Sequence, residues 1–262
     1  MGTRLHTELH RLYGPGASAS PTAGLDGLID EDGQVRAMAL SLGRPADWEA
    51  ISGVWQAVQS DLSLPAPGIA VSGMDSYQLW FSLDEAVPAA QAQAFVEALR
   101  VRYLSAMAPS RVTLLPGRAP EATRVLPPAS EWEWPAGALP PQQIGTDQWS
   151  AFVAPDLAPI FADTPWLDIP PSLDGQAELL SRLRSIKPGA WQSARALLTP
   201  APAEAPASPT AEPSGSPGPH QDPWRFLLQV MNDATVPMAS RIEAAKALLP
   251  YTKRSEGPAS GS

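Results

Sequence analysis

A proline-rich run near the C-terminus constrains the fold of this chain more than any other feature. Residues 200–219 contain seven prolines, and the other thirteen residues are Ala, Ser, Thr, Gly and Glu. A segment without large apolar side chains cannot build a core, so a semi-rigid, partly polyproline II tether is expected. The 262 residues therefore divide into an α/β domain at 1–199, a disordered linker at 200–221, a helical hairpin at 222–254 and a disordered tail at 255–262.

Composition excludes several classes of protein. The chain has no cysteine, which removes disulfides, thiolate metal sites and thiol nucleophiles and fits a reducing, cytoplasmic compartment. The polar residues His6, Glu8 and His10 interrupt the N-terminal leucines, so no secretory signal is expected, and no apolar run is long enough for a membrane span. A net charge of −9 argues against a protein that coats nucleic acid by charge alone.

Hydrophobic periodicity and turn residues predict a β-α-β-β-α-β order in a core at residues 35–115. The predicted elements are a strand at 35–42, a helix from Pro45, a hairpin of 68–72 and 77–83, a helix from Pro88 and a strand at 111–115. This order predicts an α+β fold, a two-layer α/β arrangement in which a mainly antiparallel sheet carries helices on one face. Along the second hairpin strand, alternation assigns Tyr77, Leu79, Phe81 and Leu83 to one face and Gln78, Trp80 and Ser82 to the other.

The flanks of this core are predicted in less detail. Residues 3–13 show helical leucine spacing, and 116–199 form an irregular Pro/Trp-rich extension that is expected to pack on the domain. Within it we expect a strand at 148–154, a helix capped by Asp174 that contains Leu179, Leu180, Leu183 and Ile186, and a last helix at 191–198.

Residues 72–81 (SGMDSYQLWF) carry the first family resemblance. They resemble the second motif of the archaeo-eukaryotic primase-polymerase family, in which a Ser-Gly turn precedes a strand that bears a histidine and then Leu-Trp-Phe-like residues. The resemblance covers residues 35–115 and implies that this strand faces nucleotide phosphates and template. It marks as candidate nucleotide- or nucleic-acid-binding residues Ser72, Gly73, Asp75, Gln78 and Trp80.

The chain departs from that family where chemistry would occur. The family's Asp-x-Asp metal pair falls on residues 39–42, which read ALSL here, and two hard cations need closely spaced carboxylates. Gln78 replaces the motif histidine and cannot carry a charge or shuttle a proton. Because His6 and His10 also lack a third ligand, no catalytic residue, metal site or cofactor is predicted.

The C-terminal hairpin carries a second resemblance. It rests on residues 222–228 (DPWRFLL), 231–233 (MND) and 241–251 (RIEAAKALLPY). These residues, within 222–254, are similar to a helical segment of small-terminase-like proteins of phages and prophages, which help a packaging motor recognise DNA. The resemblance implies a docking hairpin for a protein partner, with a second copy of the chain or DNA as further possibilities. Its candidate partner- or phosphate-contacting residues are Trp224, Arg225, Arg241, Lys246, Lys253 and Arg254.

Three functions remain open from the sequence. The first is a non-catalytic accessory protein of a phage-derived or mobile genetic element, associated with DNA replication or packaging through a degenerate primase-polymerase-like domain. The second is an adaptor whose hairpin at 222–254 docks a protein partner while no nucleic acid is contacted. The third, an active nucleotidyltransferase, requires metal-dependent nucleotide binding.

Overall fold

The computed structural model describes residues 3–15, 28–118, 132–199 and 246. Internal contacts divide the chain into two units, 1–203 and 204–262, and the second unit contains one described residue, Lys246, which is helical and exposed. The predictions for the linker, the hairpin and the tail otherwise lie outside the described residues. The architecture below is that of the first unit.

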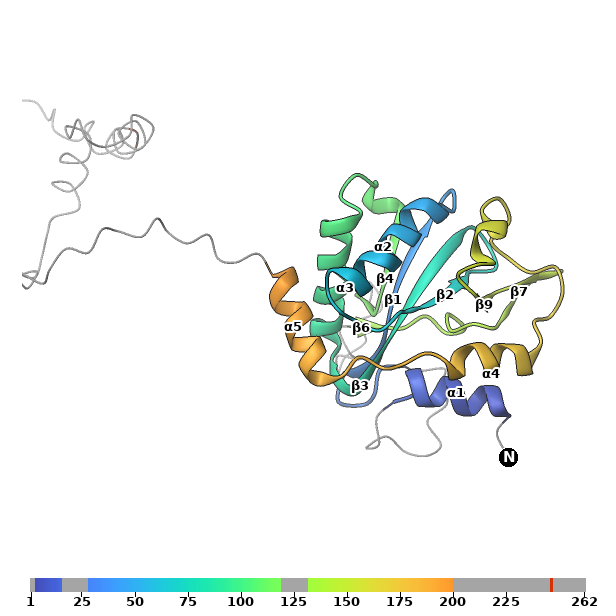
Figure 1. Cartoon of the computed structure of the whole chain (residues 1–262), viewed down its shortest axis with the longest axis horizontal. Helices are drawn as coiled ribbons and strands as arrows, with labels where there is room; N and C mark the ends of the chain where they lie inside the picture. Colours follow the sequence, from blue (N-terminus) through green and yellow to red (C-terminus); the bar gives the residue numbers. More distant parts are fainter. Residues whose placement is uncertain (1–2, 16–27, 119–131, 200–245, 247–262) are drawn as a thin grey trace, which may run out of the picture. The chain divides into compact units, whose positions relative to one another are not determined.

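A five-stranded sheet forms the centre of this unit, and its order confirms the predicted α+β class (Figure 1). The central elements are β1 (Gln34–Gly43), α2 (Trp48–Ser60), β2 (Gly68–Val71), β3 (Ser76–Pro88), α3 (Ala89–Tyr103) and β4 (Val112–Leu115). The strand order is β4-β1-β3-β2-β9, and all neighbouring strands are antiparallel. The added edge strand β9 (Ala151–Val153) lies within the strand predicted at 148–154.

Short elements and two flanking helices complete the unit. They are α1 (Arg4–Tyr13), η1 (Pro109–Arg111), β5 (Gly117–Arg118), β6 (Trp132–Glu133), β7 (Gln143–Gly145), β8 (Gln148–Trp149), η3 (Ala158–Phe161), α4 (Leu173–Ser181) and α5 (Pro188–Leu198). The predicted first and last helices are both present. In α1, the Thr3 hydroxyl accepts a bond from the His6 amide at 3.3 Å, as an N-cap does.

Two helix predictions need correction because side chains cap the helices elsewhere. The first helix of the core begins at Trp48 rather than Pro45, since the Asp47 carboxylate accepts a bond from the Ala50 amide at 3.0 Å. Likewise, Ser172 rather than Asp174 caps α4, and its hydroxyl accepts from the Gly175 amide.

The predicted extent of α4 was also wrong. The helix ends at Ser181, and Ile186 pairs with β3 instead of continuing the helix. The Ile186 amide donates to the Ser82 carbonyl at 2.7 Å, and its carbonyl accepts from the Asp84 amide at 3.0 Å. The following Lys187 precedes Pro188 and is extended, as the residue before a proline prefers, so a helix cannot run through this point.

Helices cover both faces of the sheet, but not equally. On one face, apolar residues of β1 and β3 pack against α2, α3 and α5, and this cluster includes Met38, Leu40, Leu79, Phe81 and Trp191. Both helices of the β-α-β-β-α-β unit lie on this face, as expected. The helices α1 and α4, which lie outside that unit, pack on the opposite face over a second cluster that includes Ala39, Trp80 and Phe152.

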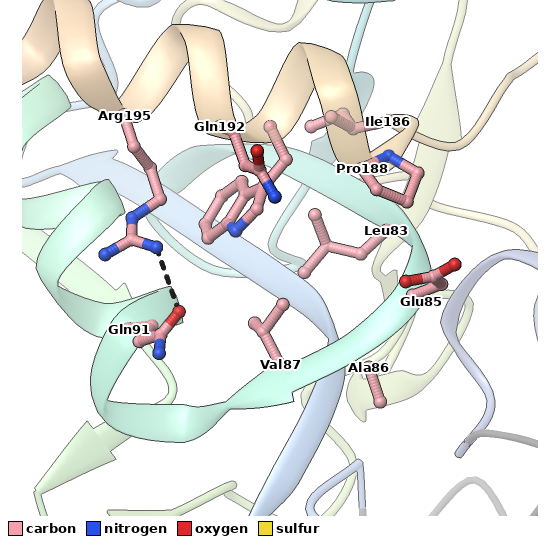
Figure 2. Close-up of a pocket in the computed structure, with 10 residues that line it drawn as sticks. Leu83, Glu85, Ala86, Val87, Gln91, Ile186, Pro188, Gln192 and Arg195 are labelled. Carbon is pink, nitrogen blue, oxygen red and sulfur yellow. Dashed lines mark hydrogen bonds between the residues drawn. The ribbon is translucent and has the colours of Figure 1, made fainter.

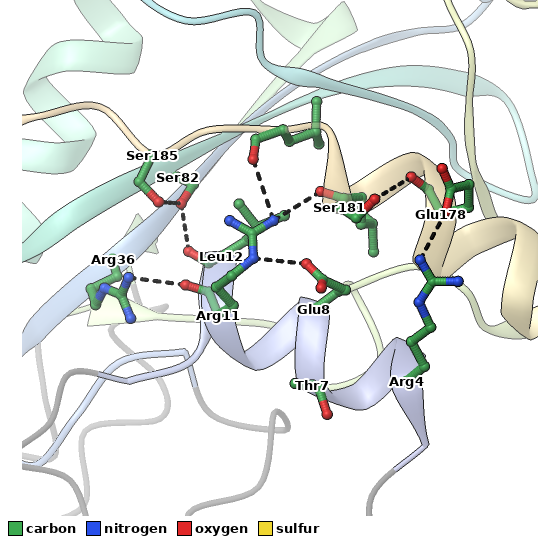
Figure 3. Close-up of polar contacts among 12 residues, drawn as sticks. Arg4, Thr7, Glu8, Arg11, Leu12, Arg36, Ser82, Glu178, Ser181 and Ser185 are labelled. Atoms are coloured by element: carbon green, nitrogen blue, oxygen red, sulfur yellow. Dashed lines mark hydrogen bonds and ion pairs between the residues drawn. The ribbon is translucent and has the colours of Figure 1, made fainter.

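Hydrogen bonds from arginine side chains connect α1 to α4 and to β1 (Figure 3). The Arg11 guanidinium donates to the carbonyls of Leu180 and Leu183, at the C-terminal end of α4, and pairs with Glu8 at 2.7 Å. From β1, Arg36 donates to the carbonyls of Arg11, Gly14 and Leu83. The bonds to Arg11, Gly14, Leu180 and Leu183 satisfy backbone acceptors at the C-terminal ends of α1 and α4, and they join the two helices in one layer.

A side chain of α4 also closes the outer edge of the sheet. The buried Gln176 carboxamide accepts from the Phe152 amide at 2.8 Å and donates to the Phe152 carbonyl at 2.9 Å. Both outward-facing backbone groups of Phe152 in β9 are thus paired without a further strand.

Candidate functional site

A cavity of about 410 Å³ lies on the α1/α4 face, beside the ends of β1, β3 and β4; we call it the sheet cavity. Residues 135–138 form its wall opposite the sheet, and Ile144 and Ser150 also border it. Its polar lining comprises Ser41, Arg44, Ser72, Asp75, Ser76, Gln78, Arg111, Thr113 and Ser150. The size is within the range of small-ligand sites.

Three polar side chains form a row across the floor of the sheet cavity. Ser41 of β1 lies directly opposite Gln78 of β3 and also opposite Thr113 of β4. Residues opposite one another in antiparallel strands share a face, so these side chains point into the same space. The Ser41 hydroxyl lies 3.2 Å from the Ser76 hydroxyl and donates to the Tyr77 carbonyl at 3.3 Å.

The orientation of the Gln78 amide is set by Trp80. The Trp80 indole nitrogen lies 2.9 Å from the Gln78 side-chain oxygen. An indole can only donate, so the amide oxygen must face it, and the amide nitrogen with its two hydrogens is left for the cavity. Gln78 therefore offers a positioned donor to a ligand.

Ser72 and Gly73 build the hairpin turn that borders the cavity. The Ser72 hydroxyl accepts from the amides of Met74, Asp75 and Ser76 at 3.1 to 3.2 Å. Gly73 has a φ of +83°, and a Cβ there would lie 2.5 Å from a side-chain carbon of Ile144 and 2.9 Å from the Ser150 nitrogen. The Ser-Gly pair is thus required by the shape of the turn.

Two arginines and one carboxylate are the charged groups among the described residues that line the sheet cavity. Arg111 is held by the Gly43 and Pro45 carbonyls and lies 3.8 Å from Asp47. Arg44 is exposed and donates to the Ser110 carbonyl, and the carboxylate of Asp75 is also exposed. In the part of the chain that the structure describes, no three His, Asp or Glu residues cluster as metal ligands would.

Trp80 lies beneath the sheet cavity instead of lining it. Its side chain is 1% exposed, and its ring centroid lies 5.5 Å from Tyr13, 5.8 Å from Trp134 and 6.2 Å from Phe152. Trp80 can influence a ligand only through Gln78. Of the five residues marked by the motif, the structure brings Ser72, Asp75 and Gln78 to the cavity and places Gly73 in the adjoining turn.

Several cavity residues were missed by the sequence analysis. Ser41 is the one polar side chain in the last four residues of the apolar strand at 35–42, which was a usable signal. Arg111 and Thr113 gave no local signal, because the pairing of β4 with β1 brings them to the cavity, and Arg44, directly after β1, had no pattern that marked it. Of the six tail candidates, Trp224, Arg225, Arg241, Lys253 and Arg254 lie outside the described residues.

A second, smaller cavity of about 200 Å³ lies on the other side of the unit, between β3, α3 and α5 (Figure 2). Arg195 of α5 donates to the Gln91 side chain at 3.0 Å across its mouth. Trp191 forms part of its lining and packs on Phe95 with ring centroids 4.6 Å apart. Besides the Trp191 indole, its polar side chains are those of Glu85, Gln91, Gln192 and Arg195, fewer than line the sheet cavity.

Comparison with known protein families finds none that matches the chain, and comparison with curated proteins finds no similar relative. Among the residues that the structure describes, no helix has the length and apolar character needed to cross a membrane.

Proposed function

We propose that the α+β unit is a non-catalytic module that binds a nucleotide or a single-stranded nucleic-acid end in the sheet cavity. The observation that carries this proposal is the row of Ser41, Gln78 and Thr113 on three adjacent strands, facing a cavity of about 410 Å³ with Arg44 on its border. The resemblance of residues 72–81 to a primase-polymerase motif supports the same assignment.

The chemistry of the lining suits a phosphorylated sugar. The Gln78 amide nitrogen and the Thr113 hydroxyl can donate to phosphate or ribose oxygens. The Ser41 hydroxyl donates its hydrogen to the Tyr77 carbonyl, so it can accept a bond from a ribose hydroxyl. Arg44 supplies positive charge beside them, and guanidinium groups match phosphate geometry. The carboxylate of Asp75 can accept a bond from a sugar hydroxyl or a base.

The same lining does not suit catalysis of nucleotidyl transfer. Ala39, Leu40 and Leu42 of β1 are buried among apolar neighbours, and only Ser41 of that segment reaches the cavity. Asp75 alone cannot hold two cations in place of a carboxylate pair. Together with the resemblances at residues 72–81 and 222–254, this supports the proposal of an accessory protein of a phage-derived or mobile genetic element, associated with DNA replication or packaging.

The test is titration of the full chain with a labelled short single-stranded DNA and with unlabelled nucleotides, followed by fluorescence anisotropy. We expect binding at low salt that is insensitive to EDTA, and about tenfold weaker binding for Gln78→Leu and for Arg44→Ala, because each removes a donor group that lines the cavity. Gln91→Leu and Arg195→Ala, at the second cavity, are matched controls that should bind normally.

Two results would reject this function. One is the absence of binding to DNA and nucleotides by the full chain even at low salt, where phosphate contacts are strongest. The other is an equal loss for the Gln91 and Arg195 variants, which would assign the contact to another surface. Binding that requires Mg²⁺ or Mn²⁺ would favour an active nucleotidyltransferase instead.

A second candidate is the adaptor in which residues 222–254 dock a protein partner and no nucleic acid is contacted. The net charge of −9 favours it, since a strongly acidic protein gains little from approach to a polyanion. A pull-down that loses one defined partner when residues 222–262 are deleted, together with no DNA binding by the full chain, would select the adaptor.

A further inference from the structure

Acidic residues are concentrated in one stretch of the α+β unit. Residues 132–181 contain no Lys or Arg, and their acidic residues are Glu133, Asp147, Asp156, Asp163, Asp168, Asp174 and Glu178. The next stretch, 182–199, has the opposite composition, with Arg182, Arg184, Lys187 and Arg195 and no acidic residue. The charge of the unit is therefore strongly asymmetric along the chain.

Within the acidic stretch, residues 154–174 also expose apolar side chains; we call these residues the acidic edge. Ile160 is 69% exposed and Ile169 is 70% exposed, more than the other large apolar residues in the described part of the chain. Leu157 and Leu173 are more than half exposed. Leu157 and Ile160 are three residues apart around η3, so their side chains project from the same side.

The backbone of the acidic edge is anchored, although these side chains are exposed. The Tyr77 hydroxyl donates to the Ala158 carbonyl at 2.6 Å, and the Gly73 amide donates to the Pro165 carbonyl at 3.0 Å. Leu167 exchanges two backbone bonds of 3.0 Å with Trp149. The segment that follows β9 is thus fixed along the side of the domain until it enters α4 (Figure 1).

Four large apolar side chains are held exposed on one fixed segment, so a partner could bury them without first ordering the backbone. The carboxylates of Asp156, Asp163 and Asp174 form no ion pair with any described residue, so they are available to a partner. Because the acidic edge contains no cation of its own, these carboxylates repel phosphate. They also repel a second acidic edge, because a symmetric contact between two copies would place like charges together.

We propose that the acidic edge docks a basic segment of a partner protein that presents Lys or Arg together with apolar side chains. Ile160 and Ile169 would supply buried contact area, and Asp156, Asp163 and Asp174 would pair with the partner's cations at the border. This division between an apolar centre and a charged border is general in protein interfaces. The surface is distinct from the sheet cavity and does not depend on what that cavity binds.

The probe is a helical peptide of Lys and Leu with one apolar and one basic face, titrated into the full chain. We expect it to bind, and the same peptide with Glu in place of Lys not to bind. The double variant Ile160→Ser/Ile169→Ser should weaken binding by about tenfold, because central apolar anchors dominate interface energy. The matched control is Val101→Ser/Leu197→Ser, which removes two comparably exposed apolar side chains from α3 and α5.

A second pair of variants separates charge from apolar contact. Asp156→Asn/Asp163→Asn should weaken binding by about threefold at low salt, and the difference should vanish at high salt as charges are screened. Glu31→Gln/Asp32→Asn, on a turn before β1, is the control and should change nothing. Because all of these side chains are at the surface, each variant should retain the circular dichroism spectrum of the parent.

Three outcomes would overturn the proposal. Equal weakening by Val101→Ser/Leu197→Ser would show nonspecific peptide binding, and unchanged binding by the Ile160/Ile169 variant would exclude the acidic edge. A dimer of the parent chain that dissociates in the Ile160/Ile169 variant, seen by sedimentation, would assign the surface to a second copy.

Discussion

The two faces of the same sheet differ in how completely they are covered. On the face of α2 and α3, Tyr77, Leu79 and Phe81 of β3 are all buried. On the opposite face, Trp80 is buried under α1 and α4, whereas Gln78, two residues earlier, borders a cavity. The strand alternates regularly, so the covering elements decide where a ligand can enter. The candidate site exists because the layer of α1 and α4 ends before Gln78.

The largest expected effect tests whether the covered part of this face is as firmly packed as the other face. Trp80→Ala and Phe81→Ala each remove a buried aromatic side chain from adjacent positions of β3, and each should lower the free energy of unfolding by about 3–5 kcal/mol. Chemical denaturation followed by circular dichroism measures both. If Trp80→Ala costs less than half as much as Phe81→Ala, the α1/α4 face is packed less tightly than the face covered by α2 and α3.

The next effect tests how α4 is held over the edge of the sheet. Gln176→Leu keeps the volume of the side chain but leaves the Phe152 amide and carbonyl without partners, which should cost about 2–4 kcal/mol for two buried groups. Denaturation of the variant measures this loss. Gln143→Leu, at an exposed position, is the control and should stay within about 0.5 kcal/mol of the parent. Similar values for the two variants would mean that water replaces the Gln176 bonds.

A smaller effect separates backbone strain from packing at the turn of the sheet cavity. Gly73 and Gly137 both have positive φ, but a methyl group added at Gly137 would meet no atom within 4 Å, whereas one added at Gly73 would collide with its neighbours. Gly137→Ala should therefore cost about 1 kcal/mol from strain, and Gly73→Ala about 2–3 kcal/mol because Ile144 and Ser150 must also move. The comparison uses thermal unfolding of both variants. Equal costs would show that the cavity border yields easily to an added methyl group.

The smallest expected effect is a pH dependence of stability at Tyr77, on the sheet face that α2 and α3 cover. Burial raises the pKa of Tyr77 to about 12, and the Asp163 carboxylate acts in the same direction. Since the folded pKa is above the unfolded value of about 10, the neutral hydroxyl stabilises the fold below pH 10, and this contribution is lost as the pH rises toward 12. Tyr77→Phe should cost about 1 kcal/mol at neutral pH, for the lost bond to Ala158, and this difference from the parent should shrink above pH 10.

Unfolding at several alkaline pH values measures this difference. A constant gap between parent and variant from pH 7 to the alkaline limit would show that Tyr77 does not titrate late. Absorbance of tyrosinate in the variant provides an independent readout, because one late-titrating group should be missing.

The strands and core helices could be predicted because the residues that indicate them are neighbours in the sequence. The alternation from Tyr77 to Leu83 and the prolines before the core helices depend on adjacent residues only, and the strand faces follow from them. Helix ends were predicted less well. An Asp or Ser two residues away from the expected first residue or cap can cap the helix instead, as Asp47 and Ser172 do.

The candidate site could be predicted only in part. Residues 72–81 pointed to Gln78 and to the turn, but the cavity also needs residues that are distant in sequence. Arg111 and Thr113 reach it through the pairing of β1 with β4, and the wall at 135–138 comes from the irregular extension. Periodicity carries no information on such contacts. For the same reason, the sequence could not show that Trp80, which resembles a ligand-stacking residue, is a support for Gln78.

The bonds between Gln176 and Phe152 also limit how other proteins can approach the domain. An unpaired edge strand is a template onto which a foreign peptide or another copy can add as a further strand, and such addition starts many aggregation processes. Here one carboxamide occupies the hydrogen-bonding groups that a newcomer would need. Recognition along this side must therefore rely on side-chain shape and charge, and this edge of the sheet is protected from the addition of a further strand.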